Sequence, residues 1–88
     1  MTTTEDWIDK LFGQILRESI SRDEIEPELR ALFYAFDDPY YREKIQSAID
    51  NAEVYASLRE PEKYGDHENI RVLLLHDLTS ATRRISQL

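Results

Sequence analysis

Apolar residues recur every three or four positions along four segments of the chain, a spacing typical of helices with one buried face. The first segment begins at Trp7 and runs through Leu16, and the last runs from Ile70 to Leu88. The pattern predicts helices over about residues 5–20, 24–36, 39–58 and 67–86, and no convincing pair of strands. We therefore expect an all-α fold, a compact four-helix bundle that forms one domain over residues 1–88 with short connections.

Capping and helix-breaking residues predict where these helices begin and end. Asp38 followed by Pro39 is typical of an N-cap and a first helical residue. The second helix should therefore end near Phe36, with a link of about two residues to the third. Pro61 predicts the one longer loop, and Asp66 is the expected cap of the last helix.

The last helix has more apolar residues than one buried face requires. Val72 and Leu75 lie off its main stripe, so residues 70–75 are apolar nearly all the way around. Either the other helices cover it on both sides, or its second face is a docking surface. A chain of 88 residues offers little material to enclose a helix, which favours docking. The expected interface residues, from the third and fourth helices, are Tyr40, Val54, Leu58, Val72, Leu75 and His76.

Composition narrows the classes of protein that fit. The chain is 41% hydrophobic and 33% charged, as a folded globular domain is. It has no cysteine and no basic leader segment, so we expect a cytoplasmic protein. No apolar run approaches the ~20 residues that cross a bilayer, so we expect no membrane contact. The formal charge of −7 and the acids among residues 38–55 argue against nucleic-acid binding by a helix-turn-helix.

Two pairs of adjacent residues are the candidates for chemistry, His76–Asp77 and His67–Glu68. Adjacent residues on a helix point in different directions, so neither pair can act as one unit. A metal-dependent hydrolase would need further ligands from other helices, and the chain has no third histidine. The sequence also has no glycine-rich phosphate loop and no nucleophile elbow. We therefore expect no enzyme, and no catalytic, metal-binding or cofactor-binding residues.

Three functional hypotheses follow. The leading one is a small acidic, non-enzymatic interaction or regulatory module that docks through an apolar face of its last helix, as a homodimer or onto a protein partner. The second is an acidic inhibitor or nucleic-acid mimic that binds a basic groove. It rests on eight basic against seventeen acidic residues in positions 1–69, a charge of −9, whereas positions 70–88 carry three against one, or +2. The third is a metal-dependent, hydrolase-like helical protein.

Overall fold

Four apolar stripes form four helices in the computed structural model, which describes residues 3–58 and 65–88. They are α1 (Thr4–Leu16), α2 (Arg22–Phe33), α3 (Pro39–Ser57) and α4 (Asp66–Gln87), and no strand occurs within the described residues. The all-α fold class expected from the apolar spacing is confirmed. Most of the loop predicted around Pro61 lies outside the described residues.

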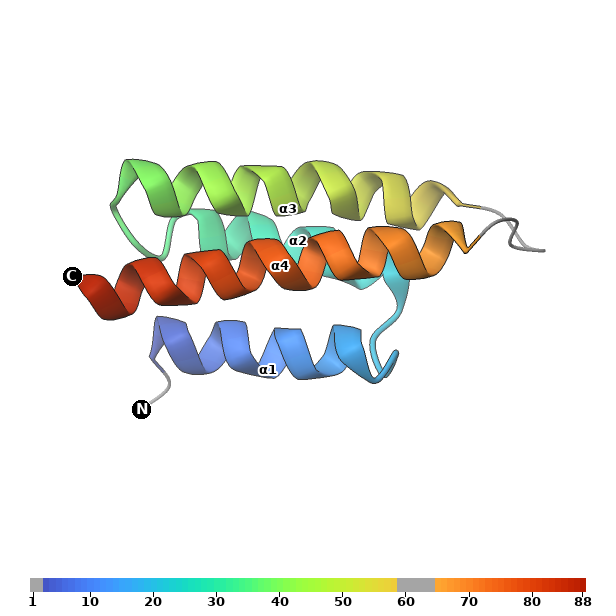
Figure 1. Ribbon diagram of the computed structural model, residues 1–88, viewed down its shortest axis with the longest axis horizontal. Helices are drawn as coiled ribbons and strands as arrows, with labels where there is room; N and C mark the ends of the chain where they lie inside the picture. Colours follow the sequence, from blue (N-terminus) through green and yellow to red (C-terminus); the bar gives the residue numbers. More distant parts are fainter. Residues whose placement is uncertain (1–2, 59–64) are drawn as a thin grey trace.

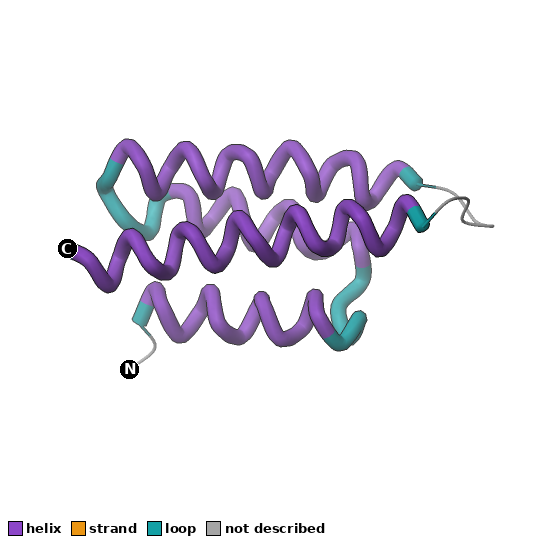
Figure 2. The backbone as a smooth tube through the Cα atoms, viewed as in Figure 1, coloured by secondary structure: helices purple, strands orange, loops and turns teal. Residues whose placement is uncertain are grey.

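Neighbouring helices along the chain run in opposite directions (Figure 1). The pair α3 and α4 packs most closely, α2 lies against α3, and α1 lies against α4 with only light contact to α2. Figure 2 shows α2 behind the other three helices, so α4 has α3 on one side and α1 on the other. The fully enclosed core residues come from all four helices: Ile8, Leu11 and Ile15; Ile25, Leu29 and Leu32; Tyr41, Ile45, Ala48, Ile49, Ala52 and Tyr55; Leu74, Leu78 and Ala81.

The helix starts depend on local side-chain caps at two of the four positions. Thr3 accepts a hydrogen bond from the Asp6 backbone N–H, and Asp6 in turn accepts from the Thr3 N–H, a capping box. Asp38 caps α3 by accepting from the Tyr41 N–H, with Pro39 as the first helical residue, so this predicted start is confirmed. The prediction for α4 was wrong by one position: Gly65 is the N-cap, with a left-handed φ of 69°, and Asp66 is the first helical residue.

Two helices end earlier than the apolar pattern predicts. Helix α1 stops at Leu16 rather than near residue 20, because Glu18 adopts a left-handed φ of 54°. The Ser19 N–H then bonds the Gln14 carbonyl and the Glu18 N–H bonds the Ile15 carbonyl, which is a Schellman termination. Helix α2 stops at Phe33, so its link to α3 is residues 34–38 rather than two residues.

Tyr41, at the start of α3, holds this longer link against the end of α2. Its hydroxyl donates over 2.5 Å to the Leu32 carbonyl near the end of α2, which also accepts from the Ala35 N–H. Its ring is enclosed and stands edge-on to Phe36, with 5.4 Å between ring centroids. Burial raises the pKa of Tyr41 to about 12, so the hydroxyl remains a donor at neutral pH.

The termination at Glu18 generates a stability prediction. The left-handed conformation costs a residue with a Cβ about 1–2 kcal/mol, whereas glycine adopts it freely. Glu18 also pairs with Arg71 across 2.5 Å at the surface, a contact that contributes at most about 1 kcal/mol. We expect Glu18→Gly to raise the free energy of unfolding by up to about 1 kcal/mol in urea denaturation. Glu18→Gln removes the charge and keeps the backbone cost, so it should be less stable than Glu18→Gly; equal stability of the two variants would contradict the argument.

Candidate functional site

Two polar contacts set the register of α3 against α4. At one end, Arg84 donates to both carboxylate oxygens of Asp38, from Nε over 2.9 Å and from Nη2 over 3.0 Å. In the middle, the Asn51 amide donates to the Asp77 carboxylate over 3.2 Å. Because the helices are antiparallel (Figure 1), moving one turn from Asp77 toward the start of α4 corresponds to moving one turn from Asn51 toward the end of α3.

That register brings exposed aliphatic side chains of the last turn of α3 and the first half of α4 together. Leu73 is one turn before Asp77, and Val54 is one turn after Asn51, so the two share the outer edge of the α3–α4 seam. Val72 lies beside Leu73 on α4. Their exposed fractions are 46% for Val54, 57% for Val72 and 49% for Leu73. We call Val54, Val72 and Leu73 the apolar patch.

The residues predicted for the interface divide among three places. Val72 and His76 are exposed on the outer side of α4, one turn apart, and Val54 is exposed in the last turn of α3. Leu58 is partly buried against the core at the end of α3, and Tyr40 is exposed at the other end of that helix. Leu75 differs from the expectation: it is partly buried and packs against the core.

Leu73, which the sequence reasoning left out, takes the exposed position instead of Leu75. The helical spacing alone leaves both residues off the main stripe, and the position of α1 decides between them. Thr79 and Thr82, one and two turns after Leu75, line a hollow together with Asp9 and Phe12 of α1, so this side of α4 faces α1. Leu73 lies on the other side, toward the seam with α3.

The histidines and the acids beside them do not form one site. His76 is exposed, whereas Asp77 is buried and bound by Asn51, so the two point apart as expected. His67 is buried at the start of α4, and its ring stands edge-on to Tyr55 at 6.0 Å between centroids. Within residues 3–58 and 65–88, no three His, Asp or Glu side chains converge in a way that could hold a metal ion.

His67 belongs to a structural cluster around Arg22. One Arg22 nitrogen, Nη1, donates to the carbonyls of Tyr55 and Leu58, each over 3.1 Å, and also lies at hydrogen-bond distance from His67 Nε2. The Arg22 guanidinium also lies over the Tyr55 ring, 5.7 Å from its centroid. These carbonyls lie at the end of α3, where no intrahelical partner exists. The cluster therefore closes α3 and joins it to the starts of α2 and α4.

Asp38 is the most strongly held carboxylate at the other end of the bundle. Its side chain is 8% exposed. The hydrogen bonds from Arg84, and after them the bond from the Tyr41 N–H, lower the pKa of Asp38 below its ordinary value, because both favour the ionised form. Arg84 lies in addition over the Tyr40 ring, 5.7 Å from its centroid, and Lys44 lies 5.3 Å from the same centroid.

Comparison of the chain with models of known protein families, with curated proteins and with solved structures finds no match. Across the described part of the chain, none of the helices combines the length and the apolar character that crossing a bilayer requires. The exposed surface of α3 and α4 is therefore the main indication of what this protein does.

The lowered pKa of Asp38 predicts how stability changes with pH. A carboxyl whose pKa is lower in the folded than in the unfolded state stabilises the fold above its unfolded value of about 3.9, and this contribution is lost as pH falls through the folded value. We expect Asp38→Asn to be less stable than the parent at pH 7, with the difference shrinking below about pH 4. Thermal denaturation at several pH values measures this.

Asp37→Asn is the matched control. Asp37 is 92% exposed and lies 3.5 Å from Arg42, so its removal should change stability little at any pH. A difference between Asp38→Asn and the parent that stays constant from pH 7 to pH 3 would contradict the assignment.

Proposed function

We propose that this chain is a non-enzymatic interaction module that pairs with a second copy of itself through the outer face of α4. We define this face as Asn69, Val72, Leu73, His76, Thr79, Ser80, Arg83 and Gln87, which recur at helical spacing. The observation that carries the proposal is the apolar patch. Single exposed aliphatic residues are ordinary on protein surfaces, but three grouped on the best-packed helix pair favour a docking surface.

The size of the domain strengthens this argument. A small domain buries a modest share of its unfolded surface. Each large apolar side chain that stays exposed to water therefore contributes no hydrophobic free energy to folding. Val72 and Leu73 lie inside α4, whereas Leu16 and Leu88 are exposed where α1 and α4 end. Burial of the apolar patch in a dimer would therefore give association a hydrophobic free energy that folding of the single chain does not gain.

The order of charges along α4 favours a second copy as the partner. Acids lie at its start, Asp66 and Glu68, and the exposed Arg83 lies one turn before its end. Two antiparallel copies of α4 that cross at His76 bring Arg83 of each copy beside the first turn of the other, because Asn69 and Arg83 are each seven residues from His76, roughly 10 Å along the axis. The contact between opposite charges then occurs twice, because a two-fold axis repeats every contact of the interface.

The same crossing pairs large side chains with small ones. Val72 is four residues before His76 and Ser80 four after it, so Val72 of one copy faces Ser80 of the other; Leu73 faces Thr79 in the same way. Small residues opposite branched aliphatic ones allow the two helices to approach closely. Val54 flanks this contact from α3 and extends the apolar area.

The acidic mimic is the second candidate, and one observation favours it. Asp23, Glu24 and Glu28 surround Pro27 on the exposed side of α2 and line a shallow hollow. However, Glu28 accepts a hydrogen bond from the Trp7 indole N–H over 2.8 Å, so part of this acidic surface has a role in joining α1 to α2. We therefore rank self-pairing first.

Leu73→Glu tests the proposed pairing. Each copy would lose the burial of one leucine, about 1.5–3 kcal/mol, and would bring a charge into the interface, so the dissociation constant of the dimer should rise by at least about tenfold. Light scattering over a dilution series reads this as a shift of the native mass toward the 10.4 kDa of one chain. Leu16→Glu is the matched control, because Leu16 is 55% exposed on α1 and should leave the mass unchanged. A parent protein that is monomeric at all concentrations would overturn the proposal.

Charge reversal tests the antiparallel arrangement. Arg83→Glu alone places acids against acids in both halves of the interface and should weaken the dimer, as Glu68→Arg alone should by opposing bases. The double variant restores opposite charges, so its dissociation constant should return toward that of the parent. Additive weakening in the double variant would mean that these residues do not face each other, even if the dimer itself exists.

A further inference from the structure

His76 occupies a special position on the outer face of α4. It is exposed, and in the antiparallel crossing proposed above it lies at the two-fold axis. The other residues of this face meet a different residue of the second copy: Val72 meets Ser80, and Asn69 meets Arg83. The residue at the axis meets only its own copy, so any charge that it carries is opposed by the same charge.

The residues around His76 at this crossing carry no charge. Val72 and Leu73 lie one turn before it, and Thr79 and Ser80 lie one turn after it. These four positions also supply the facing side chains of the second copy, because the crossing pairs Val72 with Ser80 and Leu73 with Thr79. A positive charge on both imidazole rings would therefore lie among aliphatic and hydroxyl groups, none of which can neutralise it.

The charged groups of α3 and α4 closest to His76 have other partners. Asp77, the next residue in the chain, is buried and accepts a hydrogen bond from Asn51 of α3. Lys44 of α3 lies 5.3 Å from the centroid of the Tyr40 ring, toward the end of α4. Helix α2 lies behind the other three helices (Figure 2), so it does not border this face.

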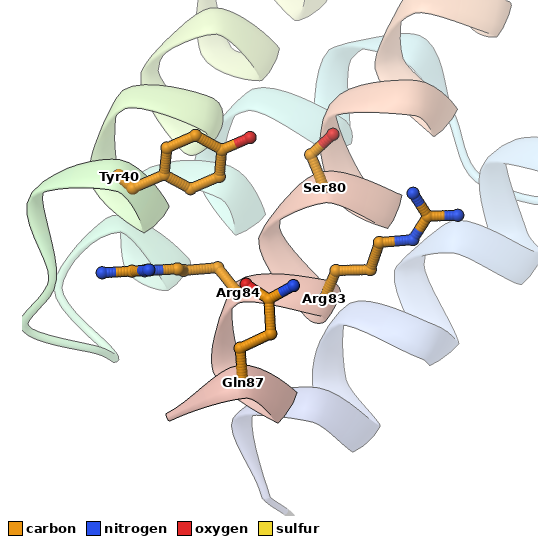
Figure 3. Close-up of a pocket in the computed structure, with 5 residues that line it drawn as sticks. All are labelled: Tyr40, Ser80, Arg83, Arg84 and Gln87. Atoms are coloured by element: carbon orange, nitrogen blue, oxygen red, sulfur yellow. The ribbon is translucent and has the colours of Figure 1, made fainter.

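The charged groups on the α1 side are also directed elsewhere. Arg71 of α4 pairs with Glu18, and Asp9 of α1 lines the hollow between the two helices. Arg83 lines the same hollow, and Figure 3 shows its side chain extending toward α1. On α4 itself, Glu68 is two turns before the imidazole and Arg83 two turns after it, roughly 10 Å away along the axis. The nearest group that could oppose a charge on this imidazole is therefore the imidazole of the second copy.

From this placement we infer that His76 makes self-pairing sensitive to pH, so that two copies pair near neutral pH and separate in mild acid. This regulation rests on the self-pairing proposed above. Histidine is the side chain that ordinarily gains its charge between about pH 8 and pH 5. Two neutral rings can pack at the axis, whereas two imidazolium ions repel each other and lose water. Since pairing disfavours proton uptake, proton uptake disfavours pairing by the same factor, and the dimer weakens as pH falls.

The test compares the dissociation constant of the dimer at about pH 7.5 and about pH 5.5, from light scattering over a dilution series. Ionic strength is held constant because salt screens the repulsion. EDTA is present throughout, because protonation would also release a metal held between two histidines. We expect an approximately tenfold higher dissociation constant at the lower pH. Far-UV circular dichroism at both pH values checks that the chain remains folded.

Two substitutions separate the charge of His76 from its mere presence at the axis. His76→Gln is neutral at both pH values, so its dissociation constant should not change between them and should stay near the neutral-pH value of the parent. His76→Lys is charged at both pH values, so its dimer should be about tenfold weaker at both. His67 is the only other histidine in the chain, and it is buried and unchanged in both variants, so it serves as an internal control.

The outcomes separate this regulation from self-pairing itself. A dimer whose dissociation constant is the same at both pH values overturns the regulation and leaves self-pairing intact. A pH dependence that persists in His76→Gln also overturns it, because the proton would then bind elsewhere. A parent that is monomeric at both pH values overturns self-pairing and the regulation together.

Discussion

The contact between Asp38 and Arg84 is the constraint on which the arrangement of α3 and α4 depends. Asp38 has a local role, capping α3 through the Tyr41 N–H, and a long-range role, holding the last turns of α4 through two bonds from Arg84. A carboxylate that is 8% exposed is stable in ionised form only with such partners. The start of α3 and the end of α4 are thereby fixed together, and everything along the seam between them follows from that register.

The sequence predicts what depends on neighbouring residues. The cap at Asp38 and the core stripe of α3 follow from Pro39 and from helical spacing, and both are confirmed. What depends on distant residues was not predicted. The partner of Asp38 is 46 residues away in the chain, and the early end of α1 depends on a left-handed Glu18, where glycine is the usual signal.

The candidate site also has a part that the sequence predicts and a part that depends on distant residues. An excess of apolar residues in α4 can be read from the sequence, but which of them faces water depends on where α1 and α3 lie. On a helical wheel, Leu73 and Leu75 lie equally far from the buried stripe of α4. Only the position of α1 assigns Leu75 to the core. Asp77 supplies a signal that could have found Leu73, because a buried acid marks the edge facing α3 and Leu73 lies one turn before it.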